Sequence, residues 1–218
     1  MKLRRDVRLS RQLEKPQMQA VVVDELDTVK CGDPDHTQHE QGVGAPLTLE
    51  AIHLVDAEIG RIVATLAEKG LRDRVNIFVT SDHGFSTQIG DSSLDELLKR
   101  DVETGDVFIV EGAIYVKNHD PEKIRRIVKR LQATPWVGAI FTRPLVLGQV
   151  EGPVPGTLSL ALAHWMHARS ADLLVSANWS GETNNYGYPG FSHQHHDEPA
   201  GHGTSSPFDV HNTLIEIG

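Results

Sequence analysis

The sequence predicts an α/β fold in which a mixed, largely parallel sheet is flanked by helices. Residues 46–70 carry apolar side chains at spacings of three and four, which indicates an amphipathic helix that ends at Gly70. The near-continuous apolar run at 75–79 is typical of a strand buried on both faces, as in parallel sheets. Together with a short apolar run at 20–25, these segments have the order of a strand–helix–strand unit.

Other segments follow the same pattern. The runs on either side of Glu111-Gly112 predict a β-hairpin. Residues 92–100 predict a short helix with serine caps, and Asp120 followed by Pro121 marks the start of another helix. Residues 171–179 predict a further buried strand.

Turn-forming residues predict loops at 26–46 and 180–207. Residues 1–18 are charged and weakly periodic, so we interpret them as an N-terminal lead-in to one domain over residues 19–218. The lead-in begins with basic residues but lacks the apolar segment of a signal peptide, so the sequence predicts no export signal. The compartment and the oligomeric state stay open.

Composition narrows the classes of partner. The net charge is −9, from 21 Lys and Arg against 30 Asp and Glu, so we expect no nucleic-acid-binding surface and no attraction to an anionic membrane. A phosphate ester remains an acceptable substrate, because a bound metal inverts the local charge. No run approaches the roughly 20 apolar residues of a membrane span. Cys31 is the single cysteine, which excludes an intrachain disulfide.

Three polar clusters lie at predicted strand ends or in loops: "DPDHTQH" (33–39), "TSDHG" (80–84) and "AGHGTSSPFD" (200–209). Asp and His together suit zinc, which takes oxygen and nitrogen ligands. Neighbouring side chains on a strand point to opposite faces, so Asp82 and His83 can share a metal only where the backbone turns. Such sites collect beyond the carboxyl ends of strands.

Plain structural interpretations also exist for the "TSDHG" cluster and for a further histidine-rich run. An Asp-His-Gly sequence is common in turns, where Asp caps and Gly adopts a left-handed conformation. The "HQHH" run (193–196) is typical of a solvated loop or an adventitious metal binder. The presence of all three clusters within one α/β pattern favours a metal site.

The stretches "DPDHTQHEQGVGAP", "VTSDHGFST" and "GHGTSSPFDVHNTLI" resemble the bacterial phosphodiesterase/nucleotide pyrophosphatase branch of the alkaline phosphatase superfamily. The resemblance runs from about Asp33 to the end of the chain. It implies an alkaline-phosphatase-like fold and zinc-dependent hydrolysis of phosphodiester or pyrophosphate bonds in a small-molecule phosphate ester.

The resemblance also implies two zinc ions. One site is complete in protein ligands, with Asp35, His39 and His202. The other is partial, with Asp82 and His83, because the family adds an aspartate from the first strand. Two ions about 4 Å apart would neutralise the phosphate oxygens and lower the pKa of the nucleophile.

The sequence departs from the family upstream of the first motif. The family places a Thr or Ser nucleophile and the first-strand aspartate there, but Ser10, Asp24, Asp27 and Thr28 lack the strand–Asp–loop–Thr–helix context. We therefore assign no nucleophile, and we expect the chain to be an internal fragment or a truncated gene product.

Three functions stay open. The first is phosphodiester or pyrophosphate hydrolysis, and the second is a catalytically inactive, zinc-binding remnant of the fold. The third is another reaction of the superfamily, on phosphomonoesters, sulfate esters or phosphonates, because specificity depends on pocket contacts. Asn184, Asn185 and Tyr186 are candidates for such contacts, with a solvated loop as the alternative.

Overall fold

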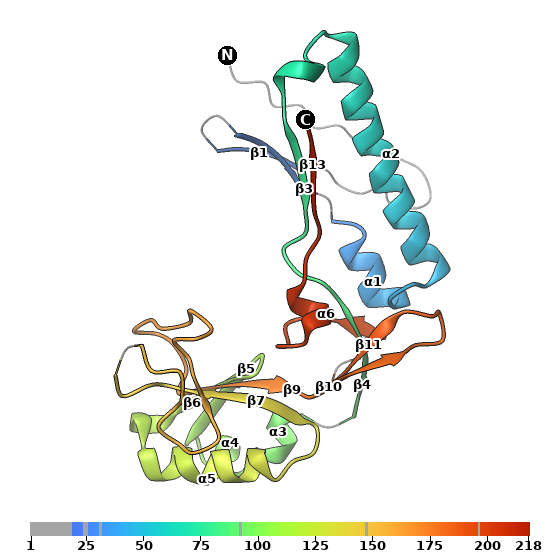
Figure 1. Cartoon of the computed structure of the whole chain (residues 1–218). Coiled ribbons are helices and arrows are strands. Elements are labelled where there is room, and N and C mark those ends of the chain that lie inside the picture. The colour runs from blue at the N-terminus through green and yellow to red at the C-terminus, as the bar shows by residue number, and fades with distance from the viewer. Residues whose placement is uncertain (1–18, 24–25, 31, 92, 147, 196) are drawn as a thin grey trace.

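The computed structural model describes residues 19–23, 26–30, 32–91, 93–146, 148–195 and 197–218. Figure 1 shows an elongated molecule, with an arm of helices and paired strands above a sheet that has helices below it. We call residues 93–146 and 148–177 the sheet region, and residues 32–91 and 197–218 the histidine region. The predicted lead-in at 1–18 lies outside the described residues.

The sheet region contains a five-stranded sheet. In spatial order its strands are β5 (Val107–Val110), β6 (Ala113–Val116), β9 (Leu173–Ala177), β7 (Val137–Thr142) and β8 (Leu158–Ser159). Three helices lie below the sheet in Figure 1: α3 (Leu94–Leu97), α4 (Lys99–Glu103) and α5 (Pro121–Gln132). The strand predicted at 171–179 is confirmed as β9.

The predicted hairpin is confirmed. Strands β5 and β6 pair antiparallel up to Val110 opposite Ala113. Glu111 and Gly112 between them have φ values of 45° and 83°. Positive φ at both positions is what a two-residue hairpin turn requires, because its twist must match that of the strands.

The predicted helix starts are confirmed too. Asp120 accepts hydrogen bonds from the backbone N–H groups of Glu122 (2.9 Å) and Lys123 (3.2 Å), so α5 begins with a capped first turn. Ser93 accepts from the N–H of Glu96 (3.2 Å) at the start of α3. The single helix predicted at 92–100 is divided into α3 and α4, which meet at Leu98.

A hydrophobic core fills the space between this sheet and its helices. Helix α5 contributes one apolar face, and the strands contribute their inward side chains. Because the core members are almost completely removed from water, burial is the main favourable term for this region. The buried cluster comprises Leu98, Val107, Ile114, Val116, Ile127, Val128, Leu131, Ile140, Leu173 and Val175.

A four-stranded sheet connects the two regions. Its order is β10 (Trp179–Thr183), β11 (Pro189–His195), β4 (Ser86–Gly90) and β12 (Ala200–Gly201). The long loop predicted for 180–207 is therefore wrong. Asn184 accepts from the N–H groups of Tyr186 (3.0 Å) and Tyr188 (3.1 Å), so the turn-forming residues close a hairpin. β11 then pairs with β4, a partner about 100 residues away that local patterns do not reveal.

The histidine region contains α1 (Asp35–Gln41), α2 (Pro46–Glu68), β3 (Ile77–Thr80) and β13 (Leu214–Ile217). Gly70 follows α2 with φ 65°, as predicted. The loop predicted at 26–46 is wrong, because β2 (Leu26–Lys30) and α1 occupy much of it. An aspartate in the first turn of α1 favours the helix through the helix dipole.

Strand pairing is antiparallel more often than the apolar runs indicated. Among the described strands, β11 with β4 and β7 with β8 are parallel. β1 (Gln19–Val23) pairs antiparallel with β2, and β3 pairs antiparallel with β13. These strand pairings do not form the strand–helix–strand unit that we expected from the apolar runs at 20–25 and 75–79. The predicted class, a mixed α/β fold with sheets flanked by helices, is confirmed.

The lengths and hydropathies of the helices also bear on membrane insertion. The other helical elements described are α6 (Pro207–Val210) and two single-turn 3-10 helices, Arg72–Arg74 and Lys117–His119. Within the described residues, no helix combines the length and the apolar composition needed to cross a bilayer.

Candidate metal centre

Asp35 and His39 lie on one face of α1. They are four residues apart, so the helical period places their side chains one above the other. Helix α1 stops at Gly42, which has φ 95°. Where the sequence pattern predicted a loop, the structure has a helix that carries two potential ligands.

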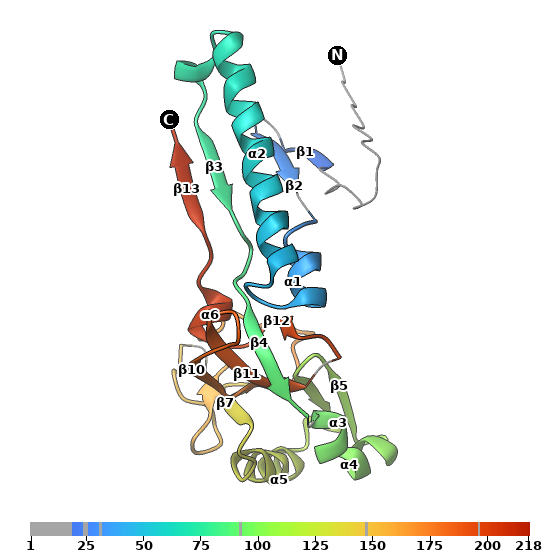
Figure 2. The same ribbon diagram turned by 90° about the vertical axis from the view of Figure 1, so that its right-hand side faces the viewer.

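His83 lies where the chain passes from β3 to β4. Figure 2 shows the two strands following one another, with residues 81–85 as a short non-strand link. Gly84 is required here, because a Cβ atom at this position would lie 2.0 Å from the carbonyl oxygen of Phe208. The close packing lets His83 turn inward, whereas the side chain of Asp82 is 80% exposed.

His202 arrives from the other end of the chain. It follows β12, which pairs antiparallel with β4, and it precedes Gly203 with φ 96°. The pairing brings His202 beside His83, and their rings stack with centroids 3.5 Å apart and planes 20° apart. Three distant segments, α1, the β3–β4 link and the residue after β12, therefore converge.

One carboxylate oxygen lies at the centre of this arrangement. Asp35 Oδ1 is 3.9 Å from His39 Nε2, 3.7 Å from His83 Nε2 and 3.8 Å from His202 Nε2. The same oxygen is buried and has no hydrogen-bond partner. We call Asp35, His39, His83 and His202 the histidine cluster.

The other ring nitrogen of two histidines is already engaged. His39 Nδ1 lies 2.8 Å from Glu198 Oε2 and 3.1 Å from the carbonyl oxygen of Ala200. His83 Nδ1 lies 3.0 Å from the carbonyl oxygen of Gly84. Donation by Nδ1–H to these oxygens leaves the Nε2 lone pairs facing Asp35, which is how ligating histidines are oriented in metal sites.

Burial affects the protonation of His202. Desolvation is the largest cause that lowers its pKa below the ordinary value of 6.5, and the neighbouring His83 and His39 lower it further. Asp35 and Asp209 act in the opposite direction. A lowered pKa keeps the imidazole neutral at pH 7, the form that binds a metal.

These observations fit a metal ion. Ligand atoms of Asp35, His83 and His202 lie within 4.8 Å of one another, so these half-buried residues could hold one. Two ligands of one tetrahedral zinc, each about 2.0–2.1 Å from it, are about 3.3 Å apart. The distances of 3.7 to 3.9 Å from Asp35 Oδ1 are close to this value and too long for hydrogen bonds. A buried carboxylate oxygen without a donor is costly unless an ion completes it.

The arrangement differs from the expected division into two sites. His83, which we expected to pair with Asp82 at a second ion, lies in the same group as Asp35 and His202. Asp82 Oδ1 is 3.6 Å from His83 Nε2, on the exposed side of the cluster. His39 is adjacent, with its ring centroid 5.0 Å from that of His202.

Sequence reasoning missed three residues around the cluster. Phe85 packs against it, with ring centroids 5.0 to 5.5 Å from those of His39, His83 and His202. Glu198 contacts His39, and Asp209 accepts hydrogen bonds beside His202. Phe85 and Asp209 stand inside the motifs quoted above, two residues after His83 and seven residues after His202, which is the only signal the sequence offers for them.

No side-chain position can be given for the residues weighed as the nucleophile, Ser10 and Thr28, or as the first-strand aspartate, Asp24 and Asp27. Ser10 and Asp24 lie outside the described residues, as do the side chains of Asp27 and Thr28. The potential substrate contacts Asn184, Asn185 and Tyr186 lie at the β10–β11 turn, where Asn184 Nδ2 donates to the carbonyl oxygen of Val43 (2.9 Å). A structural role for Asn184 is thereby established.

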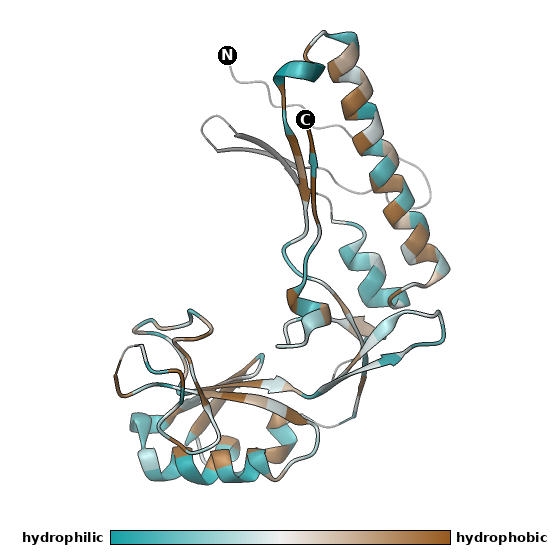
Figure 3. Cartoon of the chain, viewed as in Figure 1, coloured by the Kyte–Doolittle hydropathy of each residue, from teal (hydrophilic) through white to brown (hydrophobic). Residues whose placement is uncertain are grey.

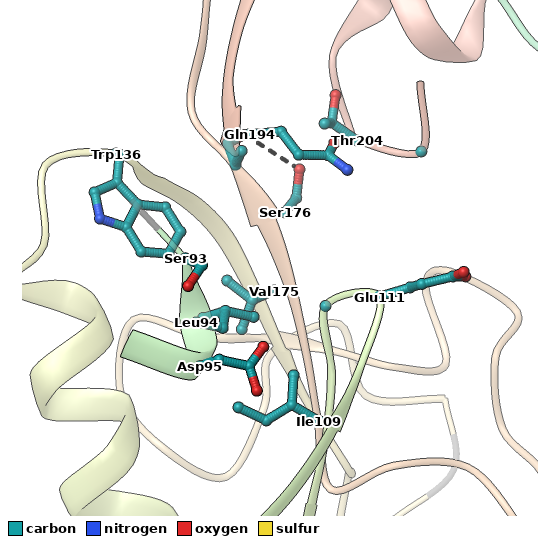
Figure 4. Close-up of a pocket in the computed structure, with 13 residues that line it drawn as sticks. Ser93, Leu94, Asp95, Ile109, Glu111, Trp136, Val175, Ser176, Gln194 and Thr204 are labelled. Atoms are coloured by element: carbon teal, nitrogen blue, oxygen red, sulfur yellow. Dashed lines mark hydrogen bonds between the residues drawn. The ribbon is translucent and has the colours of Figure 1, made fainter. Parts of the chain in front are cut away.

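A pocket of about 170 Å³ lies between the sheet region and the segment after His202. Figure 4 shows Thr204 and Ser176 near one another at one edge, with Asp95 and Ile109 at the opposite side. None of the histidine cluster lines this pocket, so it is separate from the candidate metal centre.

Comparison with known proteins identifies a family and a fold. The family model for type I phosphodiesterase / nucleotide pyrophosphatase matches residues 3–199. Human ectonucleotide pyrophosphatase/phosphodiesterase family member 7 is 38% identical over 63 residues, which are 29% of this chain and 14% of that protein.

Two solved structures have a similar fold. An inactive form of murine ectonucleotide pyrophosphatase/phosphodiesterase 5, in complex with AMP, has a TM-score of 0.53 at 20% identity. The human form of the same protein has a TM-score of 0.54 at 17% identity. Each match covers 84% of this chain and 44% of the other, so the chain spans less than half the length of these relatives. The predicted fold and the predicted resemblance are confirmed.

Proposed function

The chain belongs to the type I phosphodiesterase / nucleotide pyrophosphatase family, and from this premise we propose that it serves zinc-dependent hydrolysis of phosphodiester or pyrophosphate bonds. The observation that carries the proposal is the histidine cluster. Its buried Asp35 oxygen lacks a hydrogen-bond donor and faces three imidazole nitrogens at 3.7 to 3.9 Å. Oxygen and nitrogen donors in this arrangement suit zinc.

We assign the ligands as follows. In this proposal Asp35, His39 and His202 hold one zinc, as the family resemblance implies, and the distance of 3.7 Å between His83 Nε2 and Asp35 Oδ1 supports His83 as a further ligand of the same ion. Asp82, at 3.6 Å from His83 Nε2, is the residue from which a second ion would be bound on the exposed side. A bound zinc ion supplies Lewis-acid stabilisation of an anionic phosphoryl oxygen.

The residues of the chain prepare this chemistry. Asp35 contributes a negative charge that partly offsets the ion, and its Oδ1 atom is removed from water although the side chain is half exposed. Glu198 and the carbonyl oxygen of Gly84 hold the rings of His39 and His83 in the tautomer that presents Nε2. Neutral His202 needs no deprotonation before it binds.

The substrate we propose is a small nucleotide-like phosphate ester. A chain with a net charge of −9 repels a free phosphate ester, so a bound cation is the feature that would attract one. The AMP complex of the murine relative with a similar fold supports this substrate class.

A second candidate function is zinc binding without hydrolysis. It is favoured by three hydroxyl groups of the described residues near the cluster, each of which takes part in a hydrogen bond within the protein. Ser86 and Thr204 donate to Asp209, and Ser81 Oγ accepts from the N–H of Thr213 at 3.0 Å. A nucleophile for the covalent step must be free to attack phosphorus.

One experiment separates these functions. The zinc-loaded chain is assayed on bis(p-nitrophenyl) phosphate, p-nitrophenyl phosphate and p-nitrophenyl sulfate. The proposed function requires turnover of the diester that depends on zinc, disappears in His202→Ala and persists in His53→Ala, an exposed histidine of α2. Preference for the monoester or sulfate selects another reaction of the superfamily. Zinc uptake without turnover selects the second candidate, and no zinc uptake contradicts both.

A further inference from the structure

Asp209 is a buried carboxylate without a place in the ligand set. It belongs to the short helix α6 (Pro207–Val210) and its residue is only 3% exposed. Carboxylates are rarely buried this deeply unless donors surround them, because removing the charge from water is costly. The hydrogen bonds of the Asp209 carboxylate therefore indicate its structural role.

Both oxygens of the carboxylate accept hydrogen bonds. Ser86 Oγ donates to Oδ1. Thr204 donates to Oδ2 twice, from its hydroxyl at 2.6 Å and from its backbone N–H at 2.9 Å. Hydrogen bonds to a charged acceptor are about twice as strong as neutral ones, so this is a firm connection.

The backbone of Asp209 adds a further connection. Its carbonyl oxygen accepts from the N–H of Gly84 at 2.7 Å. The β3–β4 link is therefore bound to Asp209 at Gly84 and Ser86, and the segment after β12 is bound to it at Thr204. Gly84 directly follows His83, and Thr204 is two residues beyond His202.

The hydrogen bonds of Asp209 connect the two segments that carry His83 and His202. Their rings are stacked 3.5 Å apart, although they come from segments more than 100 residues apart in sequence. The β4–β12 pairing spans only two residue pairs, Ala200 with Thr87 and Gly201 with Ser86, and ends before His202. Asp209 continues the connection past the last paired residue.

We propose that Asp209 is a positioning residue that fixes His202 against His83 and so holds two ligands of the candidate zinc centre at the required separation. This inference rests on the proposed function for its zinc readout. A residue that supports ligands in this way typically contributes about 10–100-fold to metal affinity.

The test compares Asp209→Asn with Asp172→Asn in the full chain. Asp172 is the matched control, since it is also buried (2% exposed) and accepts hydrogen bonds, from Val116 N–H at 2.8 Å, but lies in the sheet region. Zinc affinity is measured by competition with a chromophoric chelator. We expect a loss of about 10–100-fold in Asp209→Asn and no loss in Asp172→Asn. Equal affinities in folded Asp209→Asn and wild type would overturn the proposal.

Milder variants keep the test informative if Asp209→Asn does not fold. Thr204→Val removes one donor to Asp209 and is expected to weaken zinc binding, whereas Thr204→Ser keeps the hydroxyl and is expected to retain it. Equal zinc affinities in these two variants would count against the proposal.

A metal-free readout separates this proposal from the proposed function. In the wild-type chain without zinc, the ring protons of His83 and His202 should show shifts caused by their stacking. These shifts should move in Asp209→Asn and stay constant in Asp172→Asn, whether or not the chain hydrolyses an ester. Unchanged shifts in Asp209→Asn would contradict the positioning role alone.

Discussion

The sheet region and the histidine region are built on different principles. The sheet region buries a continuous set of apolar side chains, among them Leu98, Ile114 and Leu131 at 0% exposure. Helix α2 of the histidine region has 23 residues and buries only Thr48 and Ala51. Figure 3 shows brown apolar residues along α2, β3 and β13 as well, so the contrast lies in burial and not in composition.

The contrast shows where each region gets its stability. In the sheet region, apolar burial supplies it. In the histidine region, Phe78 on β3 is 58% exposed and Leu214 on β13 is 73% exposed, so apolar burial contributes less there. Around the histidine cluster, polar contacts such as those of Asp209 connect the chain segments. A bound ion would add stability to this part and leave the other unchanged.

The largest effect is expected from a cavity in the sheet region. Leu131→Ala should lower the free energy of unfolding by about 2–5 kcal/mol, because it removes a fully buried side chain. Ile52→Ala on α2 should change it by less than about 0.5 kcal/mol, because Ile52 is 41% exposed. Urea unfolding monitored by circular dichroism measures both. Equal losses of stability in the two variants would show that apolar burial contributes alike to both regions.

The next effect concerns the ligands. His39→Ala should weaken zinc binding by at least about 10-fold, the lower end of effects from residues that merely support ligands. His36→Ala is the control on the same helix, since the side chain of His36 is 71% exposed and pairs with Glu40 at 3.5 Å. Isothermal titration with zinc measures both. A similar loss in His36→Ala would point to a general effect on α1.

Zinc should also stabilise one region selectively. At a free concentration 100 times its Kd, the ion stabilises the form that binds it by about 2.7 kcal/mol. Amide exchange should slow at residues 83–86 and 200–209, while the amides of α5 keep their rates. Uniform slowing across both regions would show that they unfold together, so that zinc stabilises the whole chain and not one region.

The smallest effect is electrostatic and lies in the sheet region. A side-chain hydrogen bond from Lys123 is the largest cause that lowers the pKa of Asp106 below its ordinary value of 3.8. With the folded-state pKa lowered, the contribution to stability is complete above the unfolded-state pKa and is lost as pH falls through the folded-state pKa.

Lys123→Met should therefore raise the pKa of Asp106 and flatten the acidic side of the stability profile. Titration of the Asp106 carboxyl carbon by NMR measures the shift directly. Lys99→Met is the control, because Lys99 pairs with Glu103 at 3.9 Å in an exposed position. A pKa of Asp106 that does not move would contradict the assignment of its cause.

Local sequence patterns predicted the elements whose determinants are local. Asp120 and Pro121 mark the start of α5, and Glu111-Gly112 forms the turn of the β5–β6 hairpin. Both were predictable because capping and turn geometry depend on neighbouring residues. The strands at 179–195 were missed, since β11 forms on β4 and that partner is remote in sequence. Helix α1 was missed because its turn-forming residues outweighed a short helical pattern.

The residues of the candidate site were predictable, but their grouping was not. Asp35, His39, His83 and His202 stand in motifs that a sequence reveals. That His83 joins Asp35 and His202 depends on the β4–β12 pairing and on the stacking of two rings. The role of Asp209 depends on tertiary hydrogen bonds, which no spacing within its motif encodes.

X-ray absorption at the zinc edge is the experiment that decides whether the histidine cluster is a zinc centre. The chain, loaded with zinc and dialysed, should retain about one tightly bound ion. Its spectrum should show nitrogen and oxygen ligands at about 2.0–2.2 Å, with the outer-shell scattering of at least two imidazoles. His202→Ala should reduce that imidazole contribution. No retained zinc, or a spectrum unchanged by His202→Ala, would contradict the account.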